Sequence, residues 1–427
     1  MEMRAAIFEN IFSKNPLDLH RLRNEAFNGC PECGSHRAVT WRLLLGYLDP
    51  RPAEWPAHLA KMRSLYDQYV EEVILQPDEE RQGASVEGSG GDHPLNLNPN
   101  SQWAKHFEDN ETLQQIDKDC RRLCPDLNFF QQASRWPRRR QASLRHRVET
   151  GLLEAQTFGR SQFGVNTLLA RPARRRNSDM FRLPEGQEAH WEVCERLLFL
   201  YTKLNPGQGY VQGMNEVLGP IYYVLASDPN PDWAAHAEPD AFFCFTSLMS
   251  EIRDHFIKEL DSSQSGIQGR MRQFQARLRL LDLPLHSRLT QLGLKSEFYA
   301  FRYLTLLLSQ EFRLPDLLRV WDSLLADPQR FNFLLDVCCA MLVLIRDQLL
   351  AADFSDCMRL VQNYPYADVR QILAKAHEFY TRRPHNAASA SGAPSSAPGR
   401  PAGALGSFDS QDGAVDAEDS TASEAGI

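Results

Sequence analysis

The sequence predicts an all-α protein, because apolar residues recur at three- and four-residue spacing along almost all of it. The segment HWEVCERLLFLYTKL is an example, since its apolar residues fall on one helical face: Trp191, Cys194, Leu198 and Tyr201. The charged residues between them are expected to face away: Glu192, Glu195 and Arg196. Runs of alternating β-branched residues, which would indicate strands, are absent from the sequence.

Three segments interrupt the helical pattern. A loop rich in Gly, Pro and Asn is expected at 78–100, and residues 134–186 form an arginine-rich, weakly patterned stretch that is typical of an exposed insertion. The last part of the chain is of low complexity and acidic, which predicts disorder. The expected organisation is an N-terminal helical extension at 1–28, one helical domain at 29–382 and a disordered tail at 383–427.

The composition excludes several classes of protein. A net charge of −8 over 427 residues disfavours a dedicated nucleic-acid binder, whose domain would be strongly basic. The most apolar run, VCCAMLVLI at 337–345, is far shorter than the ~20 residues that span a bilayer, so it predicts a buried helix. The first residues lack the apolar stretch of a leader peptide. We therefore expect a cytoplasmic protein, which the arginine-rich insertion could attach peripherally to membranes.

The cysteines do not predict a metal site. Cys30, Cys33 and His36 have the spacing of half a zinc site, but no second Cys or His pair completes it. The 9 cysteines of the chain are scattered, which is typical of reduced thiols rather than of a disulfide framework.

The motifs of a self-sufficient enzyme are also absent: the P-loop, the dinucleotide fingerprint, the nucleophile elbow and the zinc-protease helix. A candidate functional residue is Arg122, which follows a predicted apolar helix face: Leu113, Ile116, Cys120 and Leu123. Asp119 lies one helical turn before Arg122, close enough to hold its guanidinium. Pro125 is expected to end the helix soon afterwards.

The stretch GYVQGMNE, residues 209–216, supplies a second candidate. The amide of Gln212 can donate and accept hydrogen bonds at once, which suits the positioning of a water. Gly213 frees the backbone to turn or to be approached closely. A GTPase needs such an arginine and such a glutamine for transition-state charge and water orientation. Each motif alone has a simpler interpretation, since Asp-x-x-Arg is usually a solvated ion pair worth under ~1 kcal/mol, and Tyr-x-Gln is usually a local packing detail.

Taken together and in order, the motifs resemble those of the TBC-domain GTPase-activating proteins that act on Rab GTPases. The matching segments are, in chain order, Arg37-x-x-x-Trp41 with Leu44 and Leu45, Ile116-x-x-Asp119-x-x-Arg122, Gly209 to Met214, FRYLTLLLSQEF (301–312) and LRVWD (318–322). Two departures concern Leu123, where many members have Thr, and the long interval that the insertion places between the two finger motifs.

The resemblance implies a two-lobed helical domain that inserts an arginine and a glutamine into the nucleotide site of a GTP-bound Rab, thereby regulating vesicle trafficking. Arg122 would stabilise charge on the transferred phosphoryl group, because a planar guanidinium can bridge two phosphate oxygens. Gln212 would position the attacking water, Asp119 would orient Arg122, and Tyr210 with Gly213 would support the glutamine loop. Structural roles are implied for Arg37, Trp41, Ile116, Arg319, Trp321 and Asp322. GTP and Mg²⁺ would arrive with the Rab, so the chain needs no cofactor of its own.

Other interpretations stay open beside this one. A non-catalytic Rab-binding adaptor at membranes is the alternative to catalysis. The arginine clusters at 135–147 and 171–176 are interpreted first as solvated loop, and second as a contact with anionic lipid worth ~1 kcal/mol per charge. Nucleic acid is not an expected partner, because aromatics hardly interleave with these arginines. Ser178 and Ser143 each follow a basic run and are predicted phosphorylation sites.

Overall fold

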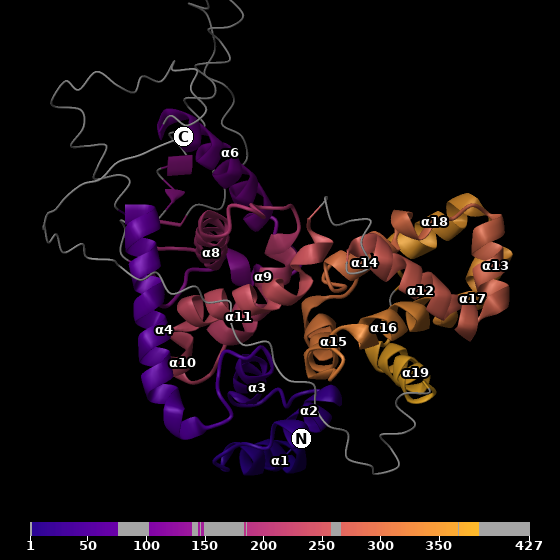
Figure 1. Cartoon of the computed structure of the whole chain (residues 1–427), viewed down its shortest axis with the longest axis horizontal. Helices are drawn as coiled ribbons and strands as arrows, with labels where there is room; N and C mark the ends of the chain where they lie inside the picture. Colours follow the sequence, from indigo (N-terminus) through magenta and orange to yellow (C-terminus); the bar gives the residue numbers. More distant parts are fainter. Residues whose placement is uncertain are drawn as a thin grey trace, which may run out of the picture. The chain divides into compact units, whose positions relative to one another are not determined.

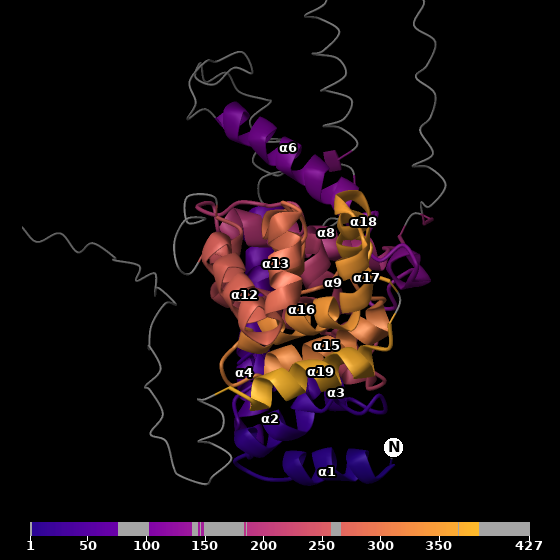
Figure 2. The same cartoon turned by 90° about the vertical axis from the view of Figure 1, so that its right-hand side faces the viewer.

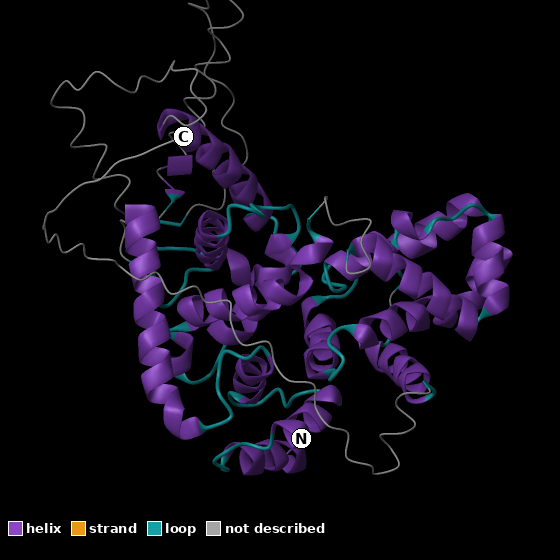
Figure 3. Ribbon diagram, viewed as in Figure 1, coloured by secondary structure: helices purple, strands orange, loops and turns teal. Residues whose placement is uncertain are grey.

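The computed structural model describes residues 2–75, 102–138, 144, 145, 147, 148, 183, 184, 186–257, 266–365 and 367–383. The expected loop, most of the insertion with Ser143 and Ser178, and residues 384–427 lie outside the described residues. The chain divides into two units, Met1–Thr381 and Arg382–Ile427, and the helices of the described residues belong to the first. Within the described residues the all-α prediction is confirmed, because there is no strand, and one isolated antiparallel bridge joins Ala133 to Ala189 (Figure 3).

The first lobe is a set of helices that pack around α8 and α9. Its elements are α3 (His36–Leu44), α4 (Trp55–Val70) with a π-helical continuation η2 (Glu71–Leu75), α6 (Gln102–Cys120), η3 (Asn128–Gln131), α8 (His190–Leu204), α9 (Met214–Ala226), α10 (Pro231–Ala234) and α11 (Ala237–Ile252). α6 packs on α8, α8 packs on α9, and α11 contacts both α9 and α4. In Figure 1 this lobe, coloured from indigo to magenta, lies on the left.

The second lobe is built around α12 and α16. Its elements are α12 (Ile267–Leu281), α13 (Leu283–Gln291), η8 (Ser296–Phe298), α14 (Ala300–Thr305), α16 (Asn332–Leu344), α17 (Arg346–Ala351), α18 (Phe354–Gln362) and α19 (Val369–Thr381). α16 packs on α12, α14 and α19. The predicted buried helix at 337–345 is α16, whose residues 333–342 are all buried. The two lobes are joined by α15 (Leu314–Ala326), which contacts α3 and α9 on one side and α16 and α19 on the other.

Residues 1–28, the expected N-terminal extension, are helical. They form α1 (Glu2–Phe12) and α2 (Leu19–Phe27), which belong to the same compact unit as the rest. α2 packs on α15, and α1 lies against α2 and α3, as the turned view in Figure 2 shows. The sequence did not indicate this packing, because a short amphipathic helix does not reveal from its own sequence which surface it covers.

The charged side of α8 also differs from the prediction, because Glu192, Glu195 and Arg196 are all buried. Arg196 donates to Glu238 at 2.7 and 2.9 Å, and it also bonds to Glu188. Burial, followed by the nearby carboxylate of Asp117, raises the pKa of Glu195 well above its ordinary value. The helix is buried all round because partners distant in sequence neutralise its charges, and periodicity alone does not reveal such partners.

No helix among the described residues is long and apolar enough to cross a membrane.

Candidate functional site

Arg122 lies just beyond the end of a helix rather than on it. α6 ends at Cys120, and the backbone N–H of Arg122 donates to the Asp119 carbonyl at 3.2 Å in the following turn. The Arg122 Nη2 donates to Asp119 Oδ1 at 3.0 Å, and its Nε donates to the Lys118 carbonyl at 3.0 Å. Nevertheless, 70% of the Arg122 side chain is exposed. The guanidinium is therefore held by Asp119 and by the Lys118 carbonyl, while most of the side chain stays exposed to solvent.

Asp119 is a buried hub, with 4% of its side chain exposed. Besides binding Arg122, its carboxylate accepts from the Tyr210 hydroxyl at 2.9 Å and from Gln115 Nε2 at 3.0 Å. Tyr210 comes from the loop that carries Gln212, so one carboxylate connects the two predicted fingers. Burial, and then the charge of neighbouring groups including Asp119, raises the pKa of Tyr210 above its ordinary value, so the phenol stays a donor.

α9 supports the arginine turn from behind. Asn215, which is buried in the first turn of α9, donates from Nδ2 to the Asp119 carbonyl at 3.2 Å. One turn further along α9, Gly219 leaves room for Leu123, because an added Cβ there would lie 3.0 Å from Leu123 Cδ1. Leu123 is fully buried, so the residue that departs from the family pattern serves as an apolar anchor for Arg122.

The glutamine loop is shaped by its backbone. Gly209 and Gly213 both have positive φ, +65° and +104°, and α9 begins directly afterwards at Met214. A Cβ added at Gly213 would lie 2.6 Å from Leu306 Cδ2, a contact that only glycine permits. Gln212 is exposed, and within the described part of the chain its side chain makes no hydrogen bond. Its amide is therefore available to an external group.

Arg122 and Gln212 line the same cavity, whose volume is about 1290 Å³ and whose walls come from both lobes. The first lobe contributes the two fingers and Glu216, whose pKa is raised by burial. The second lobe contributes residues 309–315, among them Glu311, which accepts a two-pronged bond from Arg302 at 2.6 and 2.9 Å. Sequence spacing could not establish that Arg122 and Gln212 face a common cavity, and the structure shows that both line it.

The opening motif and the LRVWD segment meet away from this cavity, at Asp322. This buried carboxylate accepts from Trp41 Nε1 at 2.8 Å, from the Arg37 guanidinium at 3.1 Å, and from the Cys30 backbone N–H at 2.8 Å. The Trp41 ring stacks on Trp321 with centroids 5.8 Å apart. These contacts fasten α3 to α15 and so join the first lobe to the lobe connection.

The remaining motif residues lie in the interior or at helix contacts. Ile116 is fully buried beneath the arginine turn. Arg319 donates to Ser323 Oγ at 2.8 Å and packs against Gly29, where an added Cβ would lie 2.7 Å from its Nε. Among the described residues, no group of three or more His, Cys, Asp or Glu side chains is arranged to hold a metal ion.

The interpretation of the 135–147 arginines as solvated loop is wrong for the three whose contacts the structure shows. Arg145 makes a two-pronged bond to Glu192 at 2.9 Å, and Arg138 pairs with Glu238 at 3.1 Å. Arg147 donates to an amide oxygen of α6 at 2.9 Å. Arg138 and Arg145 neutralise buried carboxylates and Arg147 donates to a buried amide oxygen, so these three guanidinium groups are engaged within the protein. That the arginines outside the described ranges contact membranes stays a prediction.

Three residues of the site were missed by the sequence prediction. Gln115 lies one turn before Asp119, so helical spacing could have suggested its bond. Asn215 follows the glutamine motif directly, which was a weaker signal. Leu306 contacts Gly213 from a distant part of the chain, and nothing in its local sequence indicates that contact.

Comparisons with known proteins concern the family and the fold of the chain. The family model described as Rab-GTPase-TBC domain matches residues 174–350, which include Gln212 but not Arg122. The chain is 50% identical over 388 residues to TBC1 domain family member 13 of Mus musculus and of Homo sapiens, covering 88% of this chain and 97% of each relative. The crystal structure of the Ypt/Rab-GAP domain of Gyp1p superimposes with a TM-score of 0.61 at 21% identity, covering 89% of this chain and 98% of that one, which supports the fold. The chain therefore belongs to the Rab-GTPase-TBC domain family.

Proposed function

We propose that this protein is a GTPase-activating protein for a Rab GTPase, and that it supplies Arg122 and Gln212 in trans to the nucleotide site of its partner. Membership of the Rab-GTPase-TBC domain family implies a Rab as the partner. The observation that carries the dual-finger mechanism is that both side chains are exposed on one cavity, while the Asp119 carboxylate binds both the Arg122 guanidinium and the hydroxyl of Tyr210, two residues before Gln212.

Arg122 is suited to phosphoryl transfer because its tether leaves donors free. A guanidinium has five N–H donors, and two are used, by Asp119 and by the Lys118 carbonyl, so three remain. Those three face outward with the exposed part of the side chain, where they bridge oxygens of the transferring γ-phosphoryl group of the Rab-bound GTP. Because Asp119 already orders the Arg122 side chain before the Rab binds, less conformational entropy is lost at the moment of reaction.

Gln212 complements the arginine by orienting water. Its amide oxygen accepts from the attacking water and its amide nitrogen donates to a neighbouring oxygen, the role that a glutamine has in Ras-type hydrolysis. GTP and Mg²⁺ belong to the Rab, so this chain contributes no cofactor of its own. Control of a Rab in this way would place the protein in vesicle trafficking on the cytoplasmic side of membranes.

The test is single-turnover GTP hydrolysis across a panel of GTP-loaded Rabs. We expect Arg122→Lys to slow the stimulated reaction by about 10³-fold, the lower end of the range for an arginine finger. We expect Gln212→Ala to slow it by about 10²-fold, the scale of losing one preorganised hydrogen-bonding group. Arg359→Lys is a matched control, because Arg359 is 73% exposed and pairs with Asp356 at 2.9 Å over the same i, i+3 spacing. Rab binding without acceleration by the wild-type chain would instead support the adaptor alternative.

A further inference from the structure

The two fingers differ in what holds them. Arg122 is bound by side-chain hydrogen bonds to its own lobe, whereas no such bond reaches Gln212 within the described residues. A support of the glutamine loop next to Gln212 comes from the other lobe, where Leu306 Cδ2 occupies the space that a side chain at Gly213 would need. A side chain without polar tethers takes its position from its backbone, and therefore from whatever packs against that backbone.

Leu306 begins an unusual piece of backbone that follows α14. The next two residues, Leu307 and Leu308, are both left-handed, with φ of +50° and +65°. This conformation is unfavourable for a non-glycine residue and persists only where the surroundings enforce it. Both leucines are fully buried, and the Leu308 N–H donates to the Tyr303 carbonyl at 3.0 Å. The strained turn therefore aims Leu306 at the glutamine loop.

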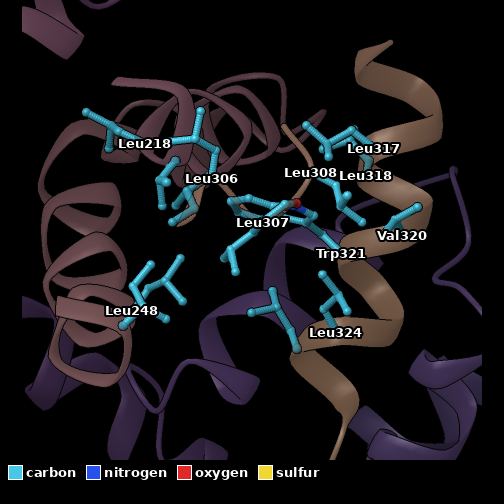
Figure 4. Packing of buried hydrophobic residues seen from close by; sticks show 14 of the residues in the cluster. Leu218, Leu248, Leu306, Leu307, Leu308, Leu317, Leu318, Val320, Trp321 and Leu324 are labelled. Carbon is cyan, nitrogen blue, oxygen red and sulfur yellow. The ribbon is translucent and has the colours of Figure 1, made fainter. Parts of the chain in front are cut away.

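Trp321 holds this turn in place. Its indole Nε1 donates to the Leu307 carbonyl at 2.9 Å. Figure 4 shows the three leucines between Leu218 of α9 and the α15 side chains, with Trp321 beside Leu307. Trp321 in turn stacks on Trp41. The opening motif is thus connected by direct contacts, through the lobe connection and the strained turn, to the backbone of the glutamine loop.

We propose that Leu306 is a positioning residue for Gln212, and that it transmits the placement of the second lobe to the glutamine loop by packing on Gly213. The inference rests on the proposed function for its effect on hydrolysis, but not for its effect on the loop. In this proposal the strained leucine turn and Trp321 position Leu306, in addition to stabilising the core. The lobe arrangement then sets where the water-orienting amide stands, while the arginine is set within the first lobe.

The first test needs no GTPase. Hydrogen exchange of the backbone amides at 209–214 is measured in the full chain for Leu306→Ala, for the volume-conserving Leu306→Met, and for Leu289→Ala, a buried leucine of α13 that serves as control. We expect exchange in the glutamine loop to rise about tenfold in Leu306→Ala only, because local opening depends on local packing. Equal exchange in Leu306→Ala and Leu289→Ala would overturn the proposal.

The second test separates positioning from general stability. With a responsive Rab, Leu306→Ala should lower the saturating rate of hydrolysis about tenfold, since a misplaced group costs 10- to 100-fold, and leave the half-saturating concentration unchanged. Leu306→Met should restore the rate, and Leu306→Ala combined with Gln212→Ala should be no slower than Gln212→Ala alone. A further, additive loss would overturn the proposal. If no Rab responds to the wild-type chain, the proposed function fails, while the exchange result still decides the role of Leu306.

Discussion

Arg122 and Gln212, on the two sides of the cavity, are held in position by different kinds of contact. Arg122 is placed by polar bonds, because a buried carboxylate, a backbone carbonyl and an amide from α9 fix the turn that carries it. Gln212 is placed by shape, because two glycines with positive φ bend its loop and a leucine from the other lobe packs against it.

This difference has a physical reason. A guanidinium needs a carboxylate to orient its donors, and it keeps enough N–H groups to serve a phosphate as well. A glutamine amide has fewer hydrogen-bonding groups, so a strong intramolecular bond would compete with the water that the proposed mechanism requires it to orient. Placement through the backbone leaves the amide free. The arginine side should therefore be sensitive to the loss of polar partners, and the glutamine side to changes of volume.

Among the residues that support Arg122 and Gln212, the largest effect is expected from Asp119→Ala. The change removes the partner of Arg122 and leaves the Tyr210 hydroxyl and the Gln115 amide without their acceptor. We expect stimulated hydrolysis to fall about 10²-fold, or ~2.7 kcal/mol, and the free energy of unfolding to fall by about 1–3 kcal/mol. Single-turnover assays and urea denaturation measure the two effects. Asp356→Ala removes an exposed ion pair of the same spacing and should change neither by more than about 0.5 kcal/mol.

Gly213→Ala probes the glutamine side and should have the next largest effect. The new Cβ would lie 2.6 Å from Leu306 Cδ2 and would also strain a residue at φ +104°, so we expect a rate about tenfold lower and a loss of stability above ~1 kcal/mol. Gly209→Ala is the matched control, because its φ is +65° but no atom lies within 4 Å of the added Cβ. Equal effects of the two substitutions would show that backbone strain, rather than contact with Leu306, governs the loop.

The same contrast explains what the sequence could and could not predict. The tether of Arg122 is local, so the Asp119 spacing and the apolar helix face were enough to anticipate an ordered arginine. The role of Gly213 as a close-approach residue was also predicted, but the approaching Leu306 was not. Contacts between distant segments have no period and no fixed spacing, so no pattern in one stretch indicates them.

The prediction that the charged face of α8 is exposed was wrong for the same reason. Helical periodicity predicted that Glu192 would face away from the core, but a carboxylate can be buried when a cation from another part of the chain reaches it. Its partner Arg145 lies in the arginine-rich stretch, whose weak pattern suggested a solvated loop. The sequence shows that arginines are abundant in this stretch, but only the fold reveals which of them are paired with carboxylates.

Tyr210→Phe gives the smallest expected effect and tests whether the two sides are independent. It deletes the hydroxyl that donates to Asp119 from the glutamine loop and keeps the ring, so the packing of the loop is unchanged. Asp119 retains Gln115 and Arg122 as partners, and we therefore expect a rate about fivefold lower, corresponding to ~1 kcal/mol for one hydrogen bond. Single-turnover hydrolysis by Tyr210→Phe, Gly213→Ala and their combination measures the coupling. If the rate losses of the two single variants multiply in the combination, the polar and apolar supports act separately. If Tyr210→Phe alone loses as much rate as Asp119→Ala, the Tyr210 bond positions both Arg122 and Gln212, and the distinction between the two sides is wrong.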